Sequence, residues 1–126
     1  MSTDCTTIIG GDFNTDISLS NLNIKAKSLK DFVNCNNLSP APMLSGRIGP
    51  NHTFRTKDMS LKSLIDYILV PEFLCNGFTK LEVRSNFPYN VSDHYPVLLY
   101  LDMNLLCNTH NKHHLDRKVL LWSKAD

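Results

Sequence analysis

Three short segments of the chain carry side chains that could take part in acid–base or metal chemistry. The first holds Asp12 and Asn14 in the run GGDFN, the second holds Asp66 in the run IDYILV, and the third holds Asp93 and His94 in the run SDHYP. A carboxylate can orient or deprotonate a water, an amide can position a phosphate oxygen, and a histidine can donate to charge on a transition state. A second carboxylate beside a cation would complete a set suited to phosphate ester hydrolysis.

Each segment also has an ordinary structural explanation. Asp66 lies within an apolar run, where burying an unpaired carboxylate costs free energy unless a donor or a cation is close. The alternative for Asp66 is an edge strand with the carboxylate facing water. GGDFN alone is typical of an Asx-type turn after a strand, and an Asp-His pair alone is most often just part of a turn. The chemistry therefore depends on the fold bringing the segments together.

The first part of the chain predicts a strand, a helix and a loop. The β-branched run 6–9 is expected to be a buried strand that stops at two glycines, in a turn that carries Asp12. Apolar residues at helical spacing predict a surface helix over 22–37, with a serine or asparagine at position 18, 20 or 21 as its N-cap. Residues 39–51 hold three prolines and two glycines and predict a loop.

The second part of the chain predicts a central strand and several shorter ones. Residues 64–70 are apolar almost throughout and end at Pro71, which indicates a strand in the middle of a sheet. The other expected elements are a short strand beginning at 52, a polar connection over 57–62, strands over 78–84 and 95–101, and a polar loop over 85–92. If the strands beside Asp12 and His94 are antiparallel neighbours or face each other across a sandwich, both loops lie on one edge, with Asp66 beneath the imidazole.

In their order along the chain, GGDFN, S-x-IDYILV and SDHYPV resemble the last three motifs of the endonuclease/exonuclease/phosphatase family, which includes DNase I and the abasic-site endonucleases. The run His52-Thr53-Phe54 is similar to the segment that usually precedes the second motif. The resemblance covers residues 6–102. The residues of the motifs and of the C-terminal segment are most similar to those of LINE-type retrotransposon endonucleases. It implies an α/β fold that is the C-terminal half of a DNase I-like α/β sandwich with mixed β-sheets and outer helices.

The resemblance also implies a role for each site residue. Asp12 would activate or orient the attacking water, and Asn14 would position that water and the scissile phosphate. Asp66 would orient His94, and His94 would stabilise the developing charge on the phosphate. Asp93 would lie beside a Mg²⁺ or Mn²⁺ ion. DNA is the partner expected for the complete protein, which would nick it.

A complete member of that family has an N-terminal half that supplies an asparagine, the principal glutamate ligand of the metal, and a tyrosine or histidine near the phosphate. We expect this chain to lack that half, and therefore to be inactive alone. Its partners would be the missing half-domain or a reverse-transcriptase region. Residues 1–102 are expected to be a partial catalytic domain and residues 103–126 a C-terminal linker or extension.

Three other functions remain open from the sequence. The chain could be an inactive fragment that acts at most as an interaction module, or it could belong to a phosphatase of the same family. A zinc site in the tail is the third, because Cys107, His110, His113 and His114 lie three to four residues apart or adjacent. The paired spacing of zinc modules is absent, which favours a solvated linker.

Bulk composition limits the chain to one ordinary globular domain. It has 126 residues, 42% of them hydrophobic, and a formal net charge of +1, so no global basic field indicates a nucleic-acid binder. The four cysteines are far apart and are expected to be reduced thiols. No signal peptide or membrane-spanning run is recognisable, so an intracellular location, nuclear or cytoplasmic, is expected, with no membrane partner.

Overall fold

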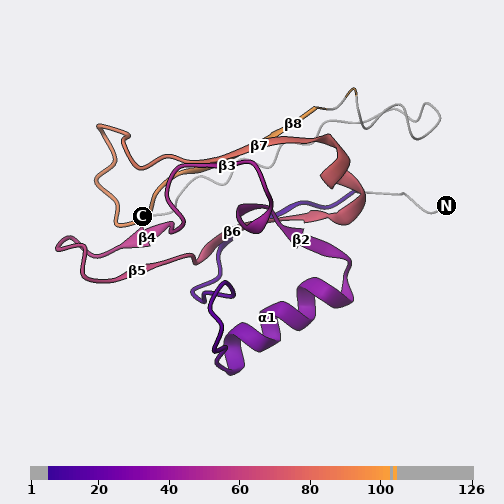
Figure 1. The fold of residues 1–126 in the computed structure, drawn as a ribbon, viewed down its shortest axis with the longest axis horizontal. Coiled ribbons are helices and arrows are strands. Elements are labelled where there is room, and N and C mark those ends of the chain that lie inside the picture. Colours follow the sequence, from indigo (N-terminus) through magenta and orange to yellow (C-terminus); the bar gives the residue numbers. More distant parts are fainter. Residues whose placement is uncertain (1–5, 103, 105–126) are drawn as a thin grey trace.

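The computed structural model describes residues 6–102 and residue 104, and these form a mixed α/β fold with small sheets (Figure 1). The described elements, in chain order, are β1 (Ile9–Asp12), α1 (Ile24–Cys35), β2 (Leu38–Pro40), η1 (Ala41–Met43), β3 (Arg47–Ile48), β4 (Phe54–Arg55), β5 (Lys62–Ser63), β6 (Asp66–Pro71), η2 (Glu72–Gly77), β7 (Phe78–Val83) and β8 (Val97–Leu101). The two η elements are 3-10 helices. Most strands are very short, so tertiary packing has to hold them in place.

The strands form two three-stranded sheets and one hairpin. The first sheet has the order β1-β6-β2 with both pairs antiparallel, so β6 is central, as its apolar sequence predicts. The second sheet has the order β3-β7-β8, in which β3 and β7 are parallel and β7 and β8 antiparallel. The third pair is the hairpin β4-β5. The architecture is therefore mixed α/β, with sheets of both strand directions.

The two faces of β6 pack against different layers. Tyr67 and Leu69 belong to a buried cluster with Ala26 and Val33 of α1. Ile68 points the other way and packs against a second cluster that includes Leu81 of β7. Side chains alternate between the two faces of a strand, so β6 joins both clusters. The layers run from α1 through the first sheet to the second sheet, as Figure 1 shows.

Several predicted boundaries are wrong. The first strand is not 6–9: it includes both glycines and Asp12, because Gly10 and Gly11 pair with β6 despite their low strand propensity. The helix begins at Ile24 rather than near 22, because the N-cap is Asn23, whose Oδ1 accepts the N–H of Ala26 at 2.9 Å.

The predicted loop 39–51 is not wholly irregular. Its first two residues belong to β2, and it also contains η1 and the two-residue strand β3. Pro40 is tolerated because β2 is an edge strand, where a missing N–H need not break a ladder. Gly49 has a φ of +97°, and a Cβ there would collide with the carbonyl oxygen of Val83. A glycine is thus required where the chain leaves β3 and passes β7.

Three further predictions concern the cysteines, membrane-spanning helices and the C-terminal segment. Cys35 and Cys75 are free thiols, as expected. Among the residues described, no helix is long and apolar enough to cross a membrane. The predicted linker, apart from residue 104, and the possible zinc ligands Cys107, His110, His113 and His114 lie outside the part that the structure describes.

Candidate active site

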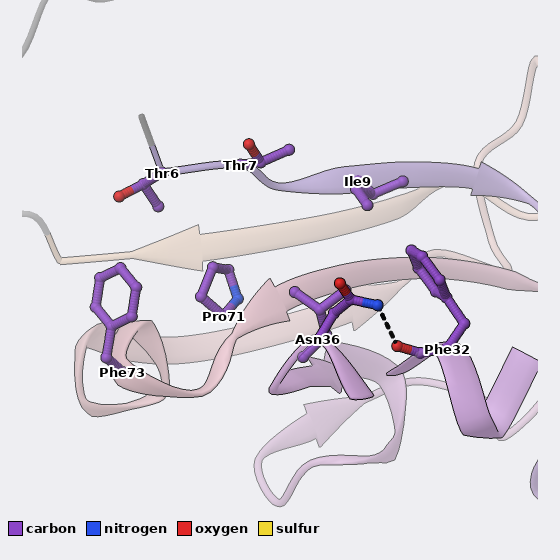
Figure 2. A pocket seen from close by; sticks show the side chains of 8 residues that line it. Thr6, Thr7, Ile9, Phe32, Asn36, Pro71 and Phe73 are labelled. Atoms are coloured by element: carbon purple, nitrogen blue, oxygen red, sulfur yellow. Dashed lines mark hydrogen bonds between the residues drawn. The ribbon is translucent and has the colours of Figure 1, made fainter. Parts of the chain in front are cut away.

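Two hollows on the described surface differ in what chemistry they can support. The first, a groove of about 530 Å³, lies between the start of the described chain, the end of α1 and η2 (Figure 2). Its lining residues are Thr6, Thr7, Ile9, Phe32, Asn36, Leu38, Pro71 and Phe73. None of these side chains is ionisable, and the amide of Asn36 is already bound to the carbonyl oxygen of Phe32 at 2.8 Å. The groove therefore offers no ionisable group for acid–base chemistry.

The second hollow, an open cavity of about 440 Å³, brings together residues from separate parts of the chain. It is lined by Asp12, Asn14, Thr15, Asp16, Leu19, Asn21, Asn23, Phe54, Ser63, Ile65 and His94. Three residues of the predicted site, Asp12, Asn14 and His94, line this cavity. It combines carboxylates, amides and an imidazole with a few apolar side chains, which is the character expected of a site for a polar ligand.

Asp66, which does not line the cavity, lies within hydrogen-bonding distance of the imidazole of His94. The Nδ1 atom of His94 lies 3.0 Å from Oδ2 and 3.2 Å from Oδ1 of Asp66, so the predicted contact is present. Asp66 has 19% of its side chain exposed and begins the central strand β6, so the alternative of an edge strand facing water is wrong. When Nδ1 carries the proton, it donates to Asp66 and leaves Nε2 for the cavity.

Asp12 faces the other nitrogen of the same imidazole. It ends β1 directly opposite Asp66 in the sheet register, and its Oδ2 lies 4.0 Å from Nε2 of His94. Its Oδ1 accepts the backbone N–H of Asn14 at 2.8 Å, which closes the Asx turn. Asn14 has a φ of +49°, a left-handed conformation that asparagine tolerates better than most residues. The turn thus fixes both side chains at the cavity mouth.

Asp12, Asp66 and His94 form a group that could hold a divalent cation. Each offers one ligand atom, and these three atoms lie within 4.8 Å of one another. Both oxygens of Asp66 lie within hydrogen-bonding distance of His94 and one oxygen of Asp12 is engaged by Asn14, which leaves Oδ2 of Asp12 most available. Mg²⁺ is usually held by only one or two carboxylates with water and substrate oxygens. The donor set therefore fits an ion that keeps several waters.

Asp93, the residue expected beside the metal, contributes differently. Its side chain is exposed and is absent from both the group of three and the cavity lining, within the range the structure describes. Its backbone oxygen accepts the N–H of Arg55 at 3.0 Å. Ser92 shapes the loop, as its Oγ accepts the backbone N–H of His94 at 3.1 Å. The ligand role of Asp93 stays a prediction.

Thr53 helps to position Asp66 and His94, although the sequence motifs did not single it out. It is fully buried, and its Oγ1 accepts the backbone N–H groups of Ile65 at 3.2 Å and Asp66 at 3.1 Å. Its backbone oxygen accepts the N–H of Tyr95 at 2.7 Å. One residue therefore ties the start of β6 to the segment that carries His94. The only signal in the sequence was its place in the run His52-Thr53-Phe54.

Phe54 and the loop after Asn14 complete the walls of the site. The ring of Phe54 meets the imidazole of His94 edge-on, with centroids 5.2 Å apart. Asp16 holds the loop to the segment just before β6, since its Oδ2 accepts the N–H of Leu64 at 2.8 Å. The hydroxyl of Tyr67 donates to the backbone oxygen of Leu64 at 2.6 Å. Burial of the hydroxyl, with a smaller effect of the nearby carboxylates, raises the pKa of Tyr67 to about 12. Tyr67 is therefore a neutral anchor at ordinary pH.

Comparison with known proteins adds no assignment. No protein-family model matches the chain, and no curated protein matches its sequence. What supports a function is thus the order of the three motifs together with the geometry around His94.

Proposed function

We propose that this chain carries one half of the active site of a metal-dependent phosphodiesterase, a DNA-nicking endonuclease in its complete form. The observation that carries the proposal is the position of His94 between two carboxylates. Nδ1 lies 3.0 Å from Asp66 and Nε2 lies 4.0 Å from Asp12, at a cavity mouth. A carboxylate, an oriented imidazole and a second carboxylate can serve as the base, the donor and the positioning group in phosphate ester hydrolysis.

Each residue has a definite task in the proposed reaction. Asp12 accepts a proton from the attacking water through Oδ2, because its Oδ1 is engaged by the N–H of Asn14, and in this step Oδ2 serves as the base and not as a ligand of the cation. Asn14 positions the water and the phosphate from the adjacent turn. His94 would donate through Nε2 to a phosphate oxygen, whose charge grows as the water attacks, while its Nδ1 faces Asp66. A bound Mg²⁺ or Mn²⁺ would neutralise phosphate charge and assist the leaving oxygen.

The proposal assigns only half of the site to this chain. The resemblance implies a glutamate as the principal metal ligand, and the chain has two glutamates, Glu72 and Glu82. Glu72 begins η2, and the carboxylate of Glu82 is paired with Arg84 on β7, so neither belongs to the group around His94. We therefore assign the metal's main anchor to an N-terminal half-domain.

The test is plasmid nicking by the chain alone and by a fusion to the N-terminal half of a family endonuclease. We expect no Mg²⁺-dependent nicking by residues 1–126 alone and activity in the fusion. In the fusion, Asp12→Asn should lower turnover by about 10²- to 10⁴-fold, the contribution of a general base. His94→Ala should lower it by about 10²- to 10³-fold, as for loss of one transition-state donor.

Asp31→Asn is the matched control, because Asp31 is an exposed carboxylate on α1. It should leave nicking unchanged. Nicking by the chain alone that Asp12→Asn abolishes would refute the half-site. A fusion that binds DNA but never nicks it would favour the inactive interaction module. Release of inorganic phosphate from a phosphomonoester, without nicking, would favour a phosphatase.

A further inference from the structure

The loop between β7 and β8 exposes an unusual concentration of apolar surface. Tyr89 has 84% of its surface exposed, Val91 has 98% and Phe87 has 45%. The rings of Phe87 and Tyr89 meet edge-on with centroids 6.3 Å apart. Single exposed apolar residues are common, but a cluster at the tip of one loop indicates a contact surface. Phe87 supports one side of the Tyr89 ring and leaves the rest of that ring free.

Hydrogen bonds join this loop to the candidate catalytic histidine. The Nδ2 of Asn90 donates to the backbone oxygen of His94 at 2.8 Å, and the N–H of Ser92 donates to Oδ1 of Asn90 at 3.0 Å. The N–H of Asn90 in turn donates to the oxygen of Phe87 at 3.0 Å. The aromatic tip is therefore held at a set position relative to His94. A ligand that contacts the tip would therefore be held at a fixed position relative to His94.

The charged side chains around the loop are mixed: the cations Arg55, Lys57 and Lys62 lie near the exposed carboxylates of Asp58, on the same hairpin, and Asp93, next to the loop. Residues 85–92 contain no Asp, Glu, Lys, Arg or His side chain. Arg55 lies at the base of the loop, where its Nη1 donates to the oxygen of Ser92 at 3.4 Å and its guanidinium lies 4.8 Å from the ring centroid of Tyr95. Exposed Lys57 and Lys62 lie on the β4-β5 hairpin, which projects from the same end of the molecule as the loop (Figure 1). Aromatic rings beside cations suit a single nucleic-acid strand better than an apolar protein surface.

We propose that the loop 85–92 is a base-stacking platform, on which Tyr89 receives an unpaired nucleobase of the strand whose phosphate lies at His94. Phe87 braces the ring of Tyr89, and Arg55 and the hairpin lysines attract the backbone. The inference rests on the proposed function and adds a specific contact to it. Stacking on an exposed aromatic ring is tolerant of sequence, because every base has a π-face. The platform would position a strand rather than read its sequence.

The test measures binding without turnover. The full chain is titrated, in EDTA, into a short fluorescein-labelled oligodeoxythymidylate and into a matched oligonucleotide whose residues lack bases, and fluorescence anisotropy is recorded. Tyr89→Ala should weaken binding to the oligodeoxythymidylate by roughly 5- to 100-fold, the effect of losing one stacked base. The baseless strand should bind the variant and the unaltered chain alike. Tyr89→Trp should retain the affinity.

Phe73→Ala is the matched control, since Phe73 is an aromatic residue with 60% of its surface exposed on η2, beside the groove of Figure 2. It should leave both affinities unchanged. The platform is refuted if Tyr89→Ala binds the oligodeoxythymidylate as tightly as the unaltered chain, or if it weakens both strands equally. It is also refuted if the unaltered chain binds neither strand. These outcomes are separate from the nicking assay, because Asp12→Asn should leave stacking intact.

Discussion

Replacing Thr53 by valine should destabilise the fold through two unsatisfied amides rather than through lost volume. Valine has nearly the shape of threonine but lacks Oγ1, which accepts the N–H groups of Ile65 and Asp66. A buried donor left without a partner costs about 1–3 kcal/mol. Because Asp66 is only partly buried, we expect the free energy of unfolding to fall by about 2–4 kcal/mol in total. Urea denaturation followed by circular dichroism should show a midpoint lower by about 1 M or more.

Thr53→Ser is the matched variant, because it keeps the acceptor and loses only a methyl group. That loss should cost about 1 kcal/mol. The expected order of stability is therefore the unaltered chain, then Thr53→Ser, then Thr53→Val. If Thr53→Val is as stable as Thr53→Ser or more so, packing of the methyl group outweighs the hydrogen bonds, and Thr53 does not anchor β6 in the way we infer.

Three further predictions follow from single residues. Gly49→Ala should lower the free energy of unfolding by about 1–3 kcal/mol or more. Gly11→Ala is the control, because a Cβ at that position meets nothing within 4 Å, and the midpoints of urea denaturation of the two variants are compared. Alkaline titration of tyrosinate absorbance should show a step near pH 12 that Tyr67→Phe removes, and stability should fall above about pH 10 as the unfolded state ionises first. Burial, and next the positive charge of Lys62, lower the pKa of His52, so Lys62→Gln should raise that pKa toward 6.5 in an NMR titration. Because the folded state favours neutral His52, the stability linked to this residue should be lost as pH falls below 6.5. An unmoved His52 titration would refute the charge effect.

Strong local patterns were enough to predict several elements of the fold. The apolar run that contains Asp66 predicted a central strand, because a strand buried on both faces needs apolar residues at nearly every position. The helical spacing around Val33 predicted α1, although its N-cap is Asn23. The extent of β1 and the strands within 39–51 could not be predicted. Glycine enters β1 and proline enters β2 only because β6 supplies a partner from a distant part of the chain, and the two-residue strand β3 forms only because β7 pairs with it.

The sequence by itself determined which residue types are available for chemistry, and the order of the three motifs indicated that Asp66 and His94 belong together. Only the tertiary structure decided their geometry. Asp12 meets Asp66 because of the register of β1 on β6, and a slip of one residue would turn its carboxylate to the other face. Thr53 acts through a hydroxyl whose partners lie twelve and thirteen residues away. Such contacts arise from the pairing of strands that are far apart in the sequence. No local pattern of residues specifies which distant strand a segment pairs with, or in which register.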